Sequence, residues 1–168
     1  DREIVLAAVQ NRGEAFDFAS EELQKDRKFV LAATQENGEV LEDVSDEFQA
    51  DREVVLAAVQ NHGEALRYAS KELRADREIV LTAVKNDGWA LIYSSKGLRA
   101  DREIVLVSFQ KCTEIPFFST SEELKADREI VMAAVQANGK ALRHVSDELR
   151  ADREIVLAAV QNDGDALE

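Results

Sequence analysis

The dipeptide Asp-Arg returns along this chain at an almost constant interval, and the residues after it return with it. Its copies begin at Asp1, Asp26, Asp51, Asp76, Asp101, Asp127 and Asp152. The interval is 25 residues, with one step of 26 before the sixth copy. A self-similar period of this length is typical of solenoids, in which each repeat is a small unit that stacks on its neighbours.

These positions divide the chain into one continuous array of repeats. The repeats span 1–25, 26–50, 51–75, 76–100, 101–126 and 127–151, and a partial copy follows at 152–168. The first copy carries the same apolar residues as the middle copies, for example Ile4, although a solenoid end usually has a polar outer face. We therefore expect further repeats or another domain beyond both ends, so that the chain is a fragment of a longer protein.

Each repeat opens with residues that favour a helix. In the first copy Asp1 is a good N-cap, and residues 4–9 form a continuous apolar run. Periodicity alone cannot separate a buried helix from a buried strand here, but alanines such as Ala7 favour the helix. The sequence predicts an α-helix over residues 2–11. It also predicts a left-handed C-cap with a positive φ at Gly13.

A second, shorter helix of about two turns is expected after the glycine, as over residues 14–19. A serine then precedes an acidic pair and an apolar residue, a pattern that predicts a capped helical turn leading into the next repeat. This serine is Ser20, Ser45, Ser70, Ser95 or Ser146. Because no such unit can bury its apolar helix alone, the sequence predicts an all-α solenoid of seven stacked repeats.

The repeats resemble a known family of tandem repeats, a domain of unknown function. Its pattern is D-R-E-x-V-L-x-A-V, then N-G, A-L-x-Y-A-S and E-E-L, and residues 51–75 and 76–100 match it nearly throughout. The likeness covers the whole chain. It implies the repeat architecture and brings no activity, substrate, cofactor or catalytic residue.

The fifth copy departs from this pattern after Leu106. It has Thr113 in place of the glycine, and Pro116 is its inserted residue and the only proline of the chain. A proline inside the second helix would break or shift it. Two interpretations stay open: drift in a tolerant copy, or a bend that shapes a groove.

Charge and hydropathy narrow the class of partner. The chain has 21 Lys and Arg against 34 Asp and Glu, a net charge of -13, which repels phosphate backbones and anionic lipids. No apolar run approaches the roughly 20 residues of a membrane-spanning helix. We therefore expect a soluble chain with neither nucleic acid nor membrane insertion. Cys112 is the only cysteine, so no disulfide forms within the chain, and the compartment stays open.

The sequence contains no catalytic, cofactor or metal signature. The Asp-Arg dipeptide recurs in every repeat, which favours a structural role in which Asp caps the helix and Arg reaches carbonyls or carboxylates of an adjacent turn. The acidic pairs also recur, which favours a solvated acidic edge. His62 and His144 do not make a zinc set with the single cysteine. A hydrolase using Cys112 as a thiol nucleophile is the enzymatic alternative. We expect a chain that is not an enzyme, with no cofactor and no metal.

Aromatic residues are the feature that points to a partner. One repeat position is occupied by Phe18, Tyr68, Tyr93, Phe118 and His144. A row of aromatic residues at one repeat position usually lies in the core. Copies four and five add apolar residues where other copies are charged, and such a patch marks a partner site more often than chance surface does. The predicted protein-binding site is Trp89, Ile92, Tyr93, Phe117 and Phe118.

The sequence therefore favours a non-enzymatic repeat scaffold that mediates protein–protein interaction or assembly. The alternative is a passive spacer or targeting module of a larger enzyme or effector.

Overall fold

The computed structural model describes residues 1–111 and 117–167, and in these residues every regular element is helical. Each repeat begins with a ten-residue α-helix, named helix A below. These helices are α1 (Arg2–Asn11), α3 (Arg27–Glu36), α5 (Arg52–Asn61), α6 (Arg77–Asn86), α7 (Arg102–Lys111), α9 (Arg128–Ala137) and α11 (Arg153–Asn162). The predicted all-α repeat fold and the helix over residues 2–11 are confirmed.

The second helix, named helix B, lies where the sequence predicts it but is a 3-10 helix. Its copies are η1 (Gly13–Phe18), η2 (Gly38–Glu42), η3 (Gly63–Tyr68), η5 (Gly88–Tyr93), η7 (Phe117–Ser119) and η8 (Gly139–His144). Its hydrogen bonds join residues three apart, as from the Ala65 N–H to the His62 carbonyl at 3.0 Å. Three residues per turn let six residues complete two turns.

Short connectors lead from helix B to the next helix A. They are α2 (Glu21–Gln24), α4 (Asp46–Gln49), η4 (Leu73–Ala75), η6 (Leu98–Ala100), α8 (Glu122–Lys125) and α10 (Asp147–Arg150). The predicted serines precede them, and the Ser70 hydroxyl accepts the Leu73 N–H at 3.3 Å. Ser20 and Ser45 make no such bond, so the cap is present in some connectors only.

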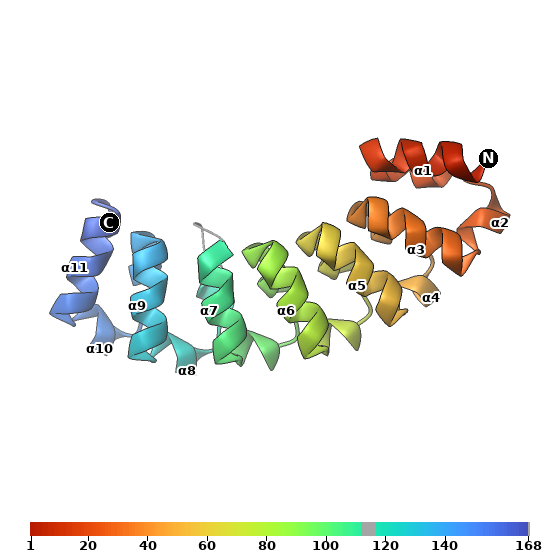
Figure 1. Ribbon diagram of the computed structural model, residues 1–168. Coiled ribbons are helices and arrows are strands. Elements are labelled where there is room, and N and C mark those ends of the chain that lie inside the picture. Colours follow the sequence, from red (N-terminus) through yellow and green to blue (C-terminus); the bar gives the residue numbers. More distant parts are fainter. Residues whose placement is uncertain (112–116, 168) are drawn as a thin grey trace.

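The A helices stand side by side in a curved array, with the connectors along its outer edge (Figure 1). Consecutive A helices pack together, as α3 does on α5 and α5 on α6, and helix B contacts its own helix A and the next one. Helices α1 and α11 lie at opposite ends of the arc (Figure 1). The repeats therefore stack in one direction, as a solenoid requires.

Helix A is buried between its neighbours. In α6 the side chains of Ile79, Val80, Ala83 and Val84 are fully buried, as the continuous apolar run predicts. The residue of the third repeat that is equivalent to Ala7, Ala57, is buried as well. Stacking on both sides thus covers more of helix A than its sequence alone indicates.

The glycines that open helix B are needed for close approach between repeats. No glycine in the described residues has a positive φ, so the predicted left-handed C-cap is wrong. Helix α5 ends instead at an extended residue, His62, with φ -139° and ψ 103°. A Cβ added to Gly63 would lie 2.5 Å from the Ala83 carbonyl oxygen of the next helix A. Only glycine leaves room for that carbonyl.

An arginine at the start of helix A ties one repeat to the next. The Arg27 Nε donates to the Asp51 carboxylate at 2.6 Å, and its Nη2 donates to Glu53 at 2.7 Å. Asp51 also caps α5 by accepting the Glu53 N–H at 3.0 Å. The same pairing joins Arg52 to Asp76 and Glu78, Arg77 to Asp101 and Glu103, Arg102 to Asp127 and Glu129, and Arg128 to Asp152 and Glu154. These arginine–carboxylate pairs therefore help to hold consecutive repeats together.

An asparagine near the end of helix A makes a second tie, directed to the preceding repeat. The Asn86 Nδ2 donates to the Gln60 carbonyl at 3.0 Å, and its Oδ1 accepts the Gly63 N–H at 2.7 Å. Asn162 makes the same contacts with the repeat before it. A complete junction therefore has three parts: packed A helices, an arginine–carboxylate pair and an asparagine–glycine contact.

Candidate functional site

The predicted aromatic site is only partly at the surface. Trp89 is the second residue of η5, its backbone N–H donates to the Asp87 carboxylate at 2.9 Å, and its side chain is half-buried. Ile92 and Tyr93 lie on the same helix and are also half-buried, and Tyr93 packs against the core. All three residues lie on η5, and their role in binding stays a prediction.

Phe117 does not belong to that surface. Its side chain is fully buried, and its ring packs edge-on against Phe109 with the centroids 5.9 Å apart. The inserted residue of the fifth repeat explains the error. Counting back ten residues from Asp127 places Phe117 at the core position of Leu66 and Leu91, whereas counting forward places it one step later, at a charged position.

Several features of the fifth repeat lie outside the described residues. They are Cys112, Thr113, Pro116 and the side chain of Phe118. The predicted bend, the thiol alternative and the Phe118 contact therefore stay predictions.

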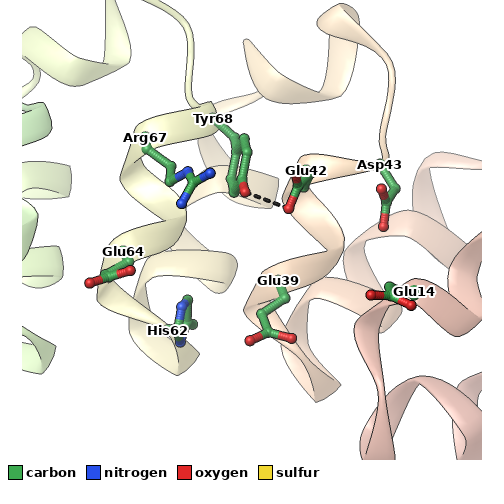
Figure 2. A pocket seen from close by; sticks show the side chains of 8 residues that line it. All are labelled: Glu14, Glu39, Glu42, Asp43, His62, Glu64, Arg67 and Tyr68. Carbon is green, nitrogen blue, oxygen red and sulfur yellow. Dashed lines mark hydrogen bonds between the residues drawn. The ribbon is translucent and has the colours of Figure 1, made fainter.

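A cleft in the first three repeats is a better-formed candidate. It has a volume of about 550 Å³ and crosses the three successive B helices η1, η2 and η3 (Figure 2). Its lining residues are Glu14, Glu39, Glu42, Asp43, His62, Glu64, Arg67 and Tyr68. Five of these eight residues are acidic. We name this feature the acidic cleft.

One wall of the acidic cleft is held by an aromatic ring. The Tyr68 hydroxyl donates to the Glu42 carboxylate of the neighbouring repeat (Figure 2). The Arg67 guanidinium lies over the Tyr68 ring, 4.6 Å from its centroid. Burial and the bond to Glu42 raise the pKa of Tyr68 to about 12. Tyr68 is therefore a neutral hydrogen-bond donor at physiological pH.

The opposite side of the acidic cleft carries crowded negative charge. Partial desolvation raises the pKa of Asp43, and the charges of Asp17, Glu42 and Glu14 raise it further. Glu14 is also paired with Arg12. A cation bound near Asp43 would relieve this repulsion, because an opposite charge within a few ångströms favours the ionised carboxylate.

The sequence interpretation missed this cleft because it weighed only the acidic pairs that precede the connecting turn, and not the carboxylates of helix B. The signal was the repeat position directly after the glycine, where Glu14, Glu39 and Glu64 follow at intervals of 25 residues. Equivalent positions of adjacent repeats are neighbours in a solenoid. Three carboxylates in that register therefore come together in space.

Two further properties of the described residues concern metal binding and the membrane. Over residues 1–111 and 117–167, no group of three or more His, Cys, Asp or Glu is arranged to hold a metal ion. In the same ranges no helix has the length and apolar character needed to cross a bilayer.

One protein family, described as a domain of unknown function (DUF4116), matches the chain in six overlapping windows. The windows are 1–49, 26–74, 51–99, 76–125, 101–150 and 127–168, and together they span the sequence. The chain belongs to the DUF4116 family. Each window starts at an Asp-Arg dipeptide, and the first five span two consecutive DUF4116 repeats with the junction between them. No curated protein and no solved structure matches the chain.

Proposed function

We propose that this DUF4116 array is a non-enzymatic scaffold that binds a basic segment of another protein in the acidic cleft. The observation that supports the proposal is a cavity of about 550 Å³ in which five carboxylates face one arginine and one histidine. Pockets of this size accommodate a few side chains of a ligand. Lys and Arg side chains are the groups that would compensate the excess of carboxylates.

The chemistry of the cleft favours recognition by pairing and stacking. Carboxylates such as Glu39 and Glu64 accept charge-assisted hydrogen bonds from guanidinium and ammonium groups. The Tyr68 ring already accommodates one guanidinium, that of Arg67, on its face. A second cation–π contact with Phe18, whose side chain is 87% exposed, would lengthen the contact along the B helices.

The cleft is also preorganised. Its side chains project from three B helices that are packed between A helices, and Gly38 and Gly63 fix the spacing of those repeats. A site held by packed elements loses little conformational entropy when a ligand binds. The net charge of -13 adds long-range attraction for a basic partner and repulsion for nucleic acid.

Binding of a fluorescent Lys/Arg-rich peptide, followed by anisotropy at low and physiological salt, tests this proposal. The cleft variant carries Glu39→Gln, Glu42→Gln and Glu64→Gln. We expect it to bind about tenfold more weakly, because each partly exposed pair contributes roughly 0.2–1 kcal/mol. Salt should weaken the wild-type complex.

A matched control separates the cleft from net charge. Glu22→Gln, Glu47→Gln and Glu123→Gln remove the same three charges from exposed connector positions. We expect this control to bind within about twofold of the wild type. Equal losses in the two variants would refute the cleft as the site. If the wild type does not bind the peptide, the passive-spacer alternative is favoured.

A further inference from the structure

The outer edge of the array, where the connectors lie, changes its charge at the fourth repeat (Figure 1). In the other complete repeats, the two residues after the connector serine include at least one acidic residue. These pairs are Glu21-Glu22, Asp46-Glu47, Lys71-Glu72, Glu122-Glu123 and Asp147-Glu148. The fourth repeat has Lys96-Gly97 at these positions. The acidic edge is therefore interrupted in the interior of the array.

A hollow of about 590 Å³ opens at this interruption, between the fourth and fifth repeats. Its lining residues are Lys96 and Arg99 of the fourth repeat and Ser119, Thr120, Ser121 and Glu122 of the fifth. We name this feature the connector pocket. It brings two cations of one repeat next to hydroxyl groups of the following repeat.

The connector pocket lies where a direct backbone contact between connectors is missing. At the preceding junction the Ser95 N–H donates to the Arg74 carbonyl at 2.8 Å. Ser121 and Arg99, the equivalent described residues, make no such bond. The second repeat also lacks this bond, but its connector begins with Asp46, whose charge would repel an anion.

Positive charge is in excess in the connector pocket. Its one carboxylate, Glu122, already pairs with Lys125 at 2.7 Å. Over residues 1–111 and 117–167, no carboxylate lies within ion-pair distance of Lys96 or Arg99. Two cations therefore line the pocket without a counter-charge from the described part of the chain.

Arg99 also lacks the hydrogen bond that an equivalent residue makes. In the second repeat the Gln49 amide donates to the Leu41 carbonyl at 3.0 Å. The equivalent carbonyl of the fourth repeat, that of Leu91, accepts the Ser94 hydroxyl at 2.8 Å. No bond joins the Arg99 guanidinium to helix B in the described residues, so its N–H groups are available to a ligand.

The fifth repeat lines the pocket with hydroxyl groups. Thr120 stands where the sixth repeat has Val145, and its hydroxyl donates to the Phe117 carbonyl at 2.8 Å. The Ser121 hydroxyl oxygen accepts the Leu124 N–H at 3.4 Å, so its hydrogen can be donated to a ligand. The pocket therefore offers an ammonium, a guanidinium and a hydroxyl donor.

We propose that the connector pocket binds a phosphate monoester carried by a serine or threonine of a partner protein. Arg99 donates two N–H groups to phosphate oxygens, Lys96 adds a second positive charge, and Ser121 donates its hydroxyl hydrogen. A volume of about 590 Å³ accommodates the phosphate and its neighbouring residues. The acidic cleft lies on the B helices of the first three repeats, so the two sites are separate.

The charge of the whole array favours a single phosphate group over a polyanion. A net charge of -13 repels nucleic acid and anionic bilayers. The acidic residues of the flanking connectors, such as Glu72 and Glu123, add repulsion at short range. One phosphate, with a charge of about -2, on a segment without other acidic residues matches two cations between negative neighbours.

Fluorescence anisotropy with two labelled peptides tests the proposal on the 168-residue chain. One peptide carries phosphoserine, the other carries serine, and neither contains Lys or Arg, so that the acidic cleft does not contribute. We expect the phosphorylated peptide to bind about tenfold more tightly or better. Inorganic phosphate should displace it, and salt should weaken the complex.

A charge-matched pair of variants locates the site. The pocket variant, Lys96→Gln with Arg99→Gln, should bind the phosphorylated peptide about tenfold more weakly. The control, Lys28→Gln with Lys85→Gln, removes two charges from exposed positions of helix A and should bind within about twofold of the wild type.

Two single variants keep the test independent of folding. Lys96 is exposed, so Lys96→Gln alone should melt like the wild type and still bind the phosphorylated peptide about threefold more weakly. Arg99→Lys retains the charge but loses the paired N–H donors, so it should bind more weakly than the wild type and more tightly than the pocket variant.

Three results would overturn the proposal. One is equal affinity of the wild type for the two peptides. Another is an equal loss of binding in the pocket variant and in its control. The third is displacement of the phosphorylated peptide by phosphatidylserine vesicles or a single-stranded oligonucleotide at lower phosphate concentrations than by the unlabelled phosphorylated peptide. The acidic-cleft variant should keep the preference for phosphate, so failure here leaves the acidic cleft as a separate question.

Discussion

Replacing Gly63 with alanine tests whether close approach between repeats, and not backbone freedom, requires this glycine. A Cβ at this position lies 2.5 Å from the Ala83 carbonyl oxygen and 2.9 Å from the backbone nitrogen of Asp87. Carbon–oxygen contacts in proteins settle near about 3.3–3.6 Å, so the third and fourth repeats would have to separate by about 1 Å. Because the φ of Gly63 is not positive, alanine adds no backbone strain of its own.

The magnitude follows from what that separation disturbs. The Gly63 N–H to Asn86 hydrogen bond, 2.7 Å long, contributes about 1 kcal/mol, and overpacking costs about 1–3 kcal/mol. Alanine returns about 0.5 kcal/mol by restricting the unfolded chain. We expect Gly63→Ala to lower the free energy of unfolding by about 1.5–3.5 kcal/mol.

Urea denaturation followed by far-ultraviolet circular dichroism measures this loss, and Gly97 supplies the control. A Cβ on Gly97 meets no atom within 4 Å, and its φ of -63° and ψ of -41° are helical. Gly97→Ala should therefore raise stability, by about 0.4–1 kcal/mol. The reasoning fails if the Gly63 and Gly97 variants are equally stable.

Three further predictions concern pH and the core. The Arg27 hydrogen bond lowers the pKa of Asp51. The stability that the ionised Asp51 contributes is therefore present above pH 3.8 and is lost as the pH falls through the lower pKa of the folded state. Acid titration of the melting temperature checks this. The pKa of Asp43 is raised, chiefly by desolvation, so its ionised form destabilises the folded chain. Asp43→Asn should therefore melt at a higher temperature than the wild type at pH 7, and at no higher temperature at pH 2, where the carboxyl group is protonated. Phe117→Ala should lower the free energy of unfolding by about 3–5 kcal/mol, whereas Trp89→Ala, at a half-buried position, should cost less; urea denaturation compares the two.

The sequence predicts the stack well because the forces that build it are local and repeated. The apolar run of helix A, its Asp cap and its arginine occur at fixed spacing, so a single repeat such as 51–75 contains the rule for the whole array. The 3-10 form of helix B is harder to predict from the sequence, because the spacing of apolar residues alone does not separate a six-residue 3-10 helix from a short α-helix.

Two errors have identifiable causes. A recurrent glycine such as Gly63 is consistent with either a positive φ or a close contact, and only the position of Ala83 in the next repeat decides between them. The register of Phe117 depended on where the extra residue of the fifth repeat was placed. Hydrophobic residues beside an insertion need to be counted from both flanking repeats before they are assigned to the surface.

The acidic cleft and the aromatic residues follow from the same geometry. Stacking places equivalent positions side by side, so a charge that recurs there, as at Glu39 and Glu64, becomes a continuous surface. The row of glutamates directly after the glycine ends at Trp89, where the fourth repeat has a tryptophan in place of the acidic residue. The arginine–carboxylate pairs on both sides of the fourth repeat stay the same across this change. Substitutions on the B helices can therefore change the surface that they line without altering the stack, and the proposed binding role requires that separation.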